Sequence, residues 1–194
     1  MMIHDYPKEF VERTLKLLDE CFDDVKSKDL EVTFLLNCLL GLIVATYEQL
    51  DLCQGDFFEK RLAETDILQF VPTKIAKVDF KEFNKRLKDE INKKSLIGQL
   101  PETISIESEI VIQGFKMAKN LTLKEFIKNI RNGIAHQNLM ATSQSENWAG
   151  VRIWNHNNHG IKDFEVEFSI AQLKKFAHFI GKSFLAHLPD KGFP

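Results

Sequence analysis

Apolar residues recur every three or four positions over much of the chain, which is the spacing of amphipathic helices. This spacing predicts a first helix over residues 7–26 and a second over residues 30–52. The centre of the second is apolar on nearly all sides, as in helices buried among others. A shorter helix is predicted over residues 56–70, and a charged amphipathic helix over residues 79–94. Residues 95–120 fit neither a helical nor a strand pattern clearly, and we assign no element there.

The pattern changes in the last third of the chain. A helix is predicted to begin at Thr122, because Thr122 and Glu125 have the spacing of a capping box that satisfies free N–H groups of the first turn. Residues 142–147 are polar and predict a linker. Apolar and polar residues then alternate on both sides of an Asn- and Gly-rich turn, which predicts a β-hairpin over about residues 150–169. Helical spacing returns over about residues 170–188.

These elements predict a mainly α fold, an antiparallel helical bundle with one β-hairpin inserted before the C-terminal helix. The helical core would cover about residues 7–140, the hairpin about 150–169 and the closing helix about 170–188. A length of 194 residues suits one domain over residues 1–194, and 44% apolar with 28% charged residues is ordinary for a globular protein.

No segment of the sequence predicts a membrane anchor. The first residues lack the basic start and apolar stretch of a signal peptide. The longest apolar run, residues 33–46, contains Asn37 and is too short to span a bilayer. We therefore expect a cytoplasmic protein that does not associate with a membrane.

The sequence also predicts neither a metal site nor a cofactor. The three cysteines, Cys21, Cys38 and Cys53, lie on apolar helical faces without CxxC spacing, so buried thiols are expected. His156 and His159 fall in the polar turn without a third ligand nearby, which favours a solvated hairpin tip. Glycine-rich phosphate loops and zinc-protease motifs are missing, which argues against the enzyme classes they mark.

Charge is sorted along the chain although the net charge is only −2. Residues 1–70 carry 7 Lys and Arg against 15 Asp and Glu. Residues 71–94 carry 8 against 4, and residues 115–131 carry 5 against 1. A fold that gathers the basic segments on one face would suit a polyanion such as RNA, although ordinary solvated helix surfaces would also explain them.

The strongest candidate for chemistry is the hexapeptide Arg-Asn-Gly-Ile-Ala-His at residues 131–136, late on the helix that begins at Thr122. The guanidinium of Arg131 can hold phosphate oxygens in two parallel hydrogen bonds and stays charged. The imidazole of His136 can exchange a proton near neutral pH. Together they offer what metal-free cleavage of an RNA phosphodiester requires, since RNA supplies its own nucleophile in the ribose 2′-OH.

The spacing of the two groups constrains how one site can use both. In an ideal helix Arg131 and His136 point about 140° apart. They can serve one small ligand only if the helix distorts near Gly133 or if a second subunit completes the site. The acidic residues Glu48 and Asp51, at the end of the second helix, are candidates to approach the motif, but the sequence does not establish this.

The pattern Arg-Asn-x-x-Ala-His on a late helix of a mainly helical domain resembles the signature of the HEPN superfamily. The resemblance implies a bundle that forms a homodimer through the motif helix and often acts as a metal-independent endoribonuclease in toxin–antitoxin or other defence systems. It implies catalytic roles for Arg131, Asn132 and His136, RNA as substrate, and an antitoxin or defence-system partner. Lys124 and Lys128, on a basic stripe of the same helix, would guide the RNA backbone. One toxin subgroup has Tyr two residues after the His, where this chain has Asn138.

Two other interpretations remain open at this point. A HEPN module can be non-catalytic and bind RNA, a nucleotide or a protein partner through the same motif. The chain could also be a helical interaction domain outside the superfamily, in which Arg131 and His136 have only structural contacts.

Overall fold

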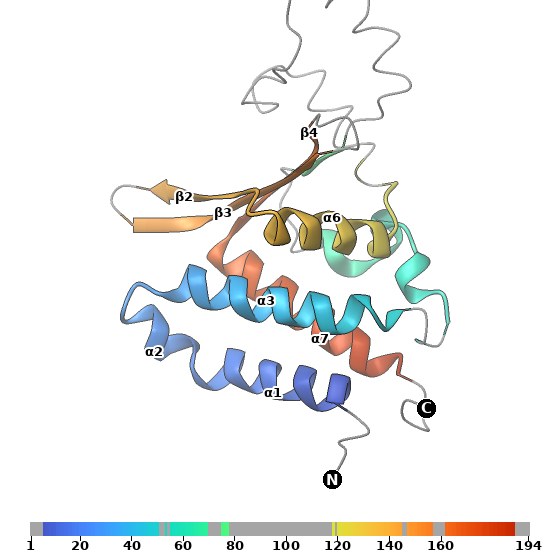
Figure 1. The fold of residues 1–194 in the computed structure, drawn as a ribbon, viewed down its shortest axis with the longest axis horizontal. Helices are drawn as coiled ribbons and strands as arrows, with labels where there is room; N and C mark the ends of the chain where they lie inside the picture. Colours follow the sequence, from blue (N-terminus) through green and yellow to red (C-terminus); the bar gives the residue numbers. More distant parts are fainter. Residues whose placement is uncertain are drawn as a thin grey trace, which may run out of the picture.

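The computed structural model describes residues 6–50, 53, 55–69, 75–77, 118, 120–144, 147–156 and 162–188. Figure 1 shows its helices and strands. The N-terminal helices are α1 (Tyr6–Glu20), α2 (Phe22–Lys26) and α3 (Glu31–Tyr47). Three short 3₁₀ helices follow, η2 (Phe57–Glu59), η3 (Leu62–Glu64) and η4 (Asp66–Gln69), and then strand β1 (Ile75–Lys77). The C-terminal part consists of α6 (Leu123–Ala135), β2 (Leu139–Gln144), β3 (Asn147–His156), β4 (Lys162–Ser169) and α7 (Ile170–Ala186).

The four strands form one antiparallel sheet in the order β1-β4-β3-β2. The hairpin predicted over residues 150–169 is confirmed as β3 and β4, with Val151 opposite Phe168 and Ile153 opposite Val166. All four of these side chains are buried, so one face of the sheet belongs to the core.

The linker predicted over residues 142–147 is wrong. Its first residues complete β2, which pairs with β3 from Leu139 opposite Ile153 to Gln144 opposite Asn147. In the part of the chain that the structure describes, β2 has only one strand neighbour. Polar residues are compatible with such an edge position, because one side of the strand meets solvent.

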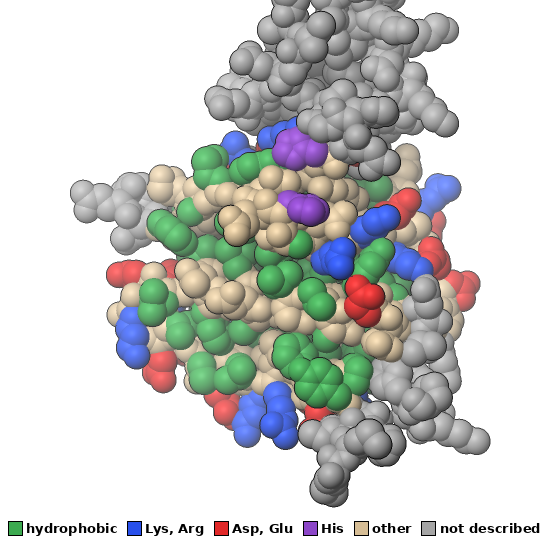
Figure 2. Space-filling view, viewed as in Figure 1, with side chains coloured by type: hydrophobic (Ala, Val, Ile, Leu, Met, Phe, Trp, Pro, Cys, Tyr) green, Lys and Arg blue, Asp and Glu red, His purple; other side chains and the backbone are tan. Residues whose placement is uncertain are grey.

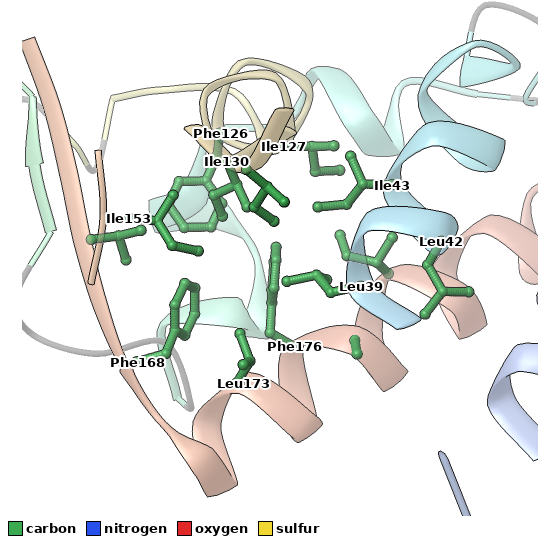
Figure 3. Close-up of a cluster of buried hydrophobic side chains, with 14 of the residues drawn as sticks. Leu39, Leu42, Ile43, Phe126, Ile127, Ile130, Ile153, Phe168, Leu173 and Phe176 are labelled. Atoms are coloured by element: carbon green, nitrogen blue, oxygen red, sulfur yellow. The ribbon is translucent and has the colours of Figure 1, made fainter. Parts of the chain in front are cut away.

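α6, α7 and α3 lie on the buried face of the sheet, and α1 lies beyond α3 (Figure 1). α6 packs on β3, α7 on β4, and α3 lies against α1, α6 and α7. These contacts on several sides confirm that the apolar second helix is buried among others. Figure 3 shows where the layers meet, with Phe126 of α6, Phe168 of β4 and Phe176 of α7 directed toward one another. The Phe168 and Phe176 rings stack with centroids 5.3 Å apart, and Phe126 meets Phe176 edge-on at 5.7 Å.

Two of the predicted helices differ from those observed. The helix over residues 7–26 is interrupted at Cys21, whose bend separates α1 from α2 and is followed by the buried Phe22. The helix over residues 56–70 is replaced by 3₁₀ turns. Its backbone groups instead bond to the segment before α6, because Leu62 N–H donates to Leu121 C=O and Leu123 N–H to Lys60 C=O, both at 2.9 Å.

The other helix ends follow local sequence signals. At the start of α6 the Thr122 hydroxyl accepts from Glu125 N–H at 3.1 Å, and the Glu125 carboxylate accepts from Thr122 N–H at 2.9 Å, which confirms the capping box. The closing helix is confirmed as α7 and begins with a second capping box between Ser169 and Gln172. The helix predicted over residues 79–94 lies outside the described residues, as does nearly all of residues 95–120.

Candidate functional site

The Arg131–His136 motif occupies the end of α6, where the chain turns from the helix into the sheet. α6 is regular through Gly133 to Ala135, and His136 is the capping residue with φ −92° and ψ 8°. His136 N–H still donates to Asn132 C=O at 2.9 Å. No distortion at Gly133 therefore brings the two functional side chains together, so the first of the two conditions set by the spacing is not met.

The turn after His136 has the hydrogen-bond pattern of a Schellman motif. Asn138 N–H donates to Gly133 C=O at 2.8 Å, and Gln137 N–H donates to Ile134 C=O at 3.0 Å. Gln137 adopts φ 57°, a left-handed conformation that costs a non-glycine residue free energy. The turn fixes the direction in which the backbone leaves His136.

We expect the variant Gln137→Gly to raise the free energy of unfolding by about 0.5–1 kcal/mol, because glycine adopts this conformation without a steric cost. Urea denaturation followed by circular dichroism measures the change. Gln137→Ala serves as the control, since it removes the side chain but keeps the strained conformation and should give no gain. Equal midpoints for the glycine and alanine variants would show that the left-handed turn carries no cost.

Gly133, inside the motif, lies directly against the backbone of β3. A Cβ atom at this position would lie 2.5 Å from Ile153 Cγ2 and 2.7 Å from the Trp154 carbonyl oxygen. Real Cβ atoms essentially never approach other atoms that closely. The glycine thus sets the distance between the helix that carries the motif and the sheet.

Arg131 is held at the surface by residues of α3 and by its neighbour. Its Nη2 lies 3.5 Å from Oε1 of Glu48, and its Nη1 donates to Oδ1 of Asn132 at 3.3 Å. The guanidinium carbon lies 5.7 Å from the centre of the Tyr47 ring. The Arg131 side chain remains 36% exposed, and such surface pairs contribute only about 0–1 kcal/mol. Glu48 therefore meets the motif, whereas Asp51 lies outside the described residues.

The other predicted site residues differ in their surroundings. His136 is exposed, and its side chain makes no hydrogen bond or ion pair with the described part of the chain. Lys128 is also exposed, whereas Lys124 is half-buried, with its Nζ 3.4 Å from Oε1 of Glu59. Figure 2 shows histidine, lysine and arginine side chains on the same face over α6 and the strands.

Two contacts of asparagine side chains tie α6 and its turn to β3, and the sequence did not single them out. Buried Asn129 donates to Glu125 C=O at 2.8 Å, and its Oδ1 accepts from Nδ2 of Asn155 at 3.3 Å. Beyond the motif, Nδ2 of Asn138 lies 3.4 Å from Nδ1 of His156. These contacts had no signal in the sequence, because the first depends on how α6 packs on β3 and the second on the register of β3 against β2.

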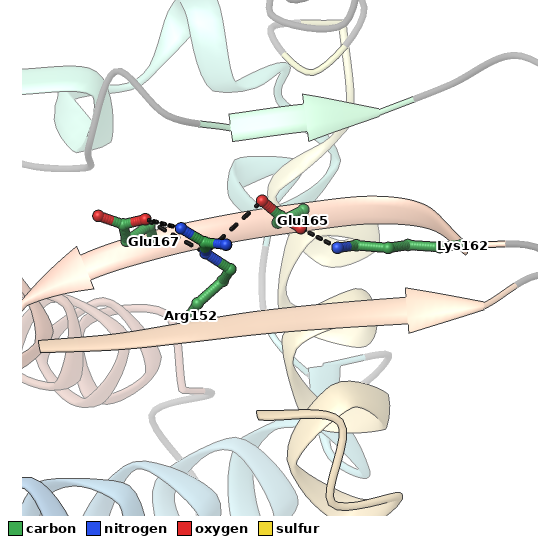
Figure 4. A network of polar contacts seen from close by, with 4 residues as sticks. All are labelled: Arg152, Lys162, Glu165 and Glu167. Atoms are coloured by element: carbon green, nitrogen blue, oxygen red, sulfur yellow. Dashed lines mark hydrogen bonds and ion pairs between the residues drawn. The ribbon is translucent and has the colours of Figure 1, made fainter. Parts of the chain in front are cut away.

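The face of the sheet that points away from the hydrophobic core carries charged side chains that pair with one another. Figure 4 shows Arg152 between Glu165 and Glu167, with Lys162 on the far side of Glu165. Arg152 Nη2 lies 2.9 Å from Oε2 of Glu167 and its Nε lies 3.8 Å from Oε1 of Glu165, while Lys162 also pairs with Glu165. This cluster therefore adds no net positive surface for a polyanion.

The remaining titratable groups in the described segments have structural surroundings. Burial lowers the pKa of His178 against the opposing effect of Asp19, 3.3 Å away. Burial also raises the pKa of Cys38 to about 11, which keeps it a thiol. Cys38 is buried as expected, while Cys21 and Cys53 are partly exposed, and all three are free.

Two further features of the described residues concern metal binding and membranes. No three His, Cys, Asp or Glu residues gather there as a metal would need. None of the helices described combines the length and the apolar character needed to cross a bilayer.

Comparison with known proteins identifies the family. The family model HEPN pEK499 p136 matches residues 1–191. No curated protein and no solved structure matches the chain. Because the family match covers nearly the whole sequence, the alternative of a helical domain outside the HEPN superfamily is excluded. The chain belongs to the HEPN pEK499 p136 family.

Proposed function

We propose that this HEPN protein is a metal-independent endoribonuclease that cleaves RNA through attack of a ribose 2′-OH on the adjacent phosphorus. HEPN domains are typically ribonucleases. The observation that carries the proposal is the position of the motif, with a partly exposed guanidinium and an exposed imidazole at the solvent-facing end of α6. Such groups are accessible to a large polyanionic substrate without any opening of the core.

Each motif residue has a chemical role in the proposed reaction. Arg131 binds the phosphate oxygens and stabilises the negative charge that develops as the phosphorus becomes five-coordinate. His136 transfers a proton at one of the two reacting oxygens. Asn132, whose Oδ1 already accepts from Arg131, orients the guanidinium. Lys128 and Lys124 attract the RNA backbone along α6, so affinity should fall with salt.

The proposed active form is a homodimer with the α6 helices facing each other. α6 is regular, so Arg131 and His136 of one protomer diverge by about 140° in projection. Groups from two protomers would then complete one site. Exposed apolar side chains occur on α3, which packs on α6, and on β2, which follows α6 in the chain, with Val44 at 42% and Met140 at 50%, and such side chains are often covered by a protein contact. Sedimentation equilibrium tests the dimer.

A test of the proposed nucleophile compares three substrates of one sequence: RNA, 2′-O-methyl RNA and DNA, each with excess EDTA. The proposal predicts cleavage of RNA alone, because only RNA carries a free 2′-OH. Cleavage of the methylated strand or of DNA would overturn the proposed nucleophile.

A toxin–antitoxin or other defence setting, or RNA processing, would supply the biological context, with an antitoxin or defence protein as partner.

A second candidate function is a non-catalytic module that binds RNA, a nucleotide or a protein through the same motif. The contact of Arg131 with Glu48 favours it over the enzyme, because a guanidinium already paired with a carboxylate is less able to stabilise the negative charge that develops during cleavage. RNA binding with strong salt dependence but without turnover, in the substrate comparison above, would support this candidate over the enzyme.

We expect Glu48→Gln to increase RNA affinity by about 2- to 5-fold at low salt, because the substitution frees Arg131 from a surface pair that contributes about 0–1 kcal/mol. Fluorescence anisotropy with a labelled oligonucleotide measures the affinity. Glu9→Gln is the matched control, since it removes the same charge from an ion pair with Arg13 on α1. An equal gain in both variants would attribute the effect to net charge alone, without a role for Arg131.

A further inference from the structure

A second histidine lies beside the turn that ends the motif helix. His156 is exposed at the end of β3, and its Nδ1 is 3.4 Å from Nδ2 of Asn138. Asn138 is itself fixed by two backbone hydrogen bonds, from its N–H to Gly133 C=O at 2.8 Å and from Trp154 N–H to its C=O at 3.0 Å. The imidazole is thus attached to the same turn that positions His136.

His136 and His156 are both exposed and lie on the two sides of Asn138. Asn138 follows His136 by two residues, so their Cα atoms are at most about 7 Å apart. His156 is within 3.4 Å of the Asn138 side chain, so both histidines flank the turn that follows α6. The other histidines that the structure describes, His178 and His187, belong to the region of α7.

The contact with Asn138 occupies Nδ1 of His156, so Nε2 is the ring nitrogen that can donate a proton. When the imidazole is neutral, its Nδ1 accepts from the Asn138 amide, so the hydrogen is on Nε2. When the imidazole is protonated, Nε2 again carries a hydrogen, and the amide can rotate so that its oxygen accepts from Nδ1. Asn138 can therefore hold the ring in both charge states, as a residue that donates and regains a proton requires.

None of the described carboxylates pairs with Nε2 of His156. Lys162 is opposite His156 in the β3–β4 register. The Lys162 ammonium pairs with Glu165 and lies 5.3 Å from the centre of the Trp154 ring. Glu165 and Glu167 in turn pair with Arg152. The imidazole of His156 thus has only the Asn138 amide as a polar side-chain contact in that part of the chain.

We propose that His156 is a second proton-transfer residue of the ribonuclease site and that Asn138 is its positioning residue. This inference rests on the proposed function. The 2′-oxygen forms a bond to phosphorus as His136 accepts its proton, and the bond from phosphorus to the 5′-oxygen breaks as Nε2 of His156 gives that oxygen a proton. The products are a 2′,3′-cyclic phosphate and a free 5′-OH, and the two histidines return to their initial states by exchanging protons with water.

The test uses the whole 194-residue chain and two substrates of the same nucleotide sequence. One is ordinary RNA, and the other has sulfur in place of the 5′-bridging oxygen at the linkage that the wild type cleaves. A thiolate leaves without protonation, so the second substrate does not need a general acid. Rates are measured for the wild type and for His156→Gln, Asn138→Leu and His136→Gln, with His187→Gln as the matched control far from the motif. Circular dichroism shows that each variant is folded.

We expect the variants to differ in their rates on ordinary RNA and on the sulfur-containing substrate. His156→Gln should cleave ordinary RNA about 100- to 10,000-fold more slowly than the wild type and recover most of that loss on the sulfur substrate. Asn138→Leu should show the same selectivity with a smaller loss, whereas His136→Gln should lose activity on both substrates. Full activity of His156→Gln on RNA, or an equal loss on both substrates, would overturn the role of His156 but would not affect the proposed ribonuclease function. Failure of the wild type to cleave any RNA would overturn the proposed function and this inference together.

Discussion

Replacing His136 by glutamine is expected to lower the rate of RNA cleavage by at least about 100-fold, because the amide cannot accept the proton that the 2′-OH loses. The side chain is exposed and makes no polar contact in the described structure, so its loss should leave the fold intact. The measurement is the single-turnover rate on a labelled oligonucleotide. His187→Gln, a change of the same chemistry near the end of α7, should retain wild-type activity.

Two substitutions of Arg131 distinguish the effect of its positive charge from the effect of its paired hydrogen-bond donors. Arg131→Ala should lower cleavage by about 100- to 1,000-fold, as expected for a group that stabilises charge in the transition state. Arg131→Lys keeps the charge but loses the paired donors, so an intermediate rate is expected. A lysine variant as active as the wild type would indicate that Arg131 acts only through its charge. Unchanged rates in both Arg131→Ala and His136→Gln would remove the motif from the reaction.

We expect substitution of Gly133 to lower the stability of the fold. Gly133→Ala places a Cβ 2.5 Å from Ile153 Cγ2 and 2.7 Å from the Trp154 carbonyl oxygen, and that oxygen belongs to the backbone of a central strand. α6 must therefore move away from β3. We expect a loss of about 1–3 kcal/mol in the free energy of unfolding even though alanine favours helix formation. The same displacement would separate the His136 turn from β3, so activity should fall as well.

Gly41→Ala provides the control for this prediction. Gly41 also lies inside a helix, but a Cβ there would meet the ring of Phe10, with the nearest atom, Cζ, at 2.9 Å. Because Phe10 is partly exposed on α1, its side chain can rotate, and the change should stay within about 1 kcal/mol of the wild type. Thermal unfolding compares the two variants. Equal stability of Gly133→Ala and Gly41→Ala would show that the close approach to β3 is unimportant.

The sequence predicts the elements whose structure depends on local signals. The capping box at Thr122 marks the start of α6, and the alternation around Val151 and Phe168 marks the strands of the hairpin. The 3₁₀ turns and β2 could not be predicted in this way. Their backbone partners come from other parts of the chain, Leu121 and Leu123 for the turns and the residues of β3 for β2. Long-range pairing there overrides the local pattern.

In the candidate site, too, the sequence identifies some residues, whereas other contacts depend on how distant segments pack together. Arg131 and His136 could be identified from spacing and chemistry within six residues of sequence. The approach of Glu48 to Arg131 was left open by the sequence and depends on how α3 packs on α6. The contact between Asn138 and His156 could not be predicted, because the two residues are 18 positions apart and meet only through the pairing of β2 with β3.

Cleavage of RNA by its own 2′-OH without a metal leaves characteristic product ends, and these ends can be measured. Purified protein is incubated with a defined RNA in excess EDTA, and the fragments are examined by mass spectrometry. The proposed mechanism predicts a 2′,3′-cyclic phosphate on one fragment and a 5′-OH on the other. Fragments with 3′-OH and 5′-phosphate ends, or cleavage that EDTA abolishes, would contradict it.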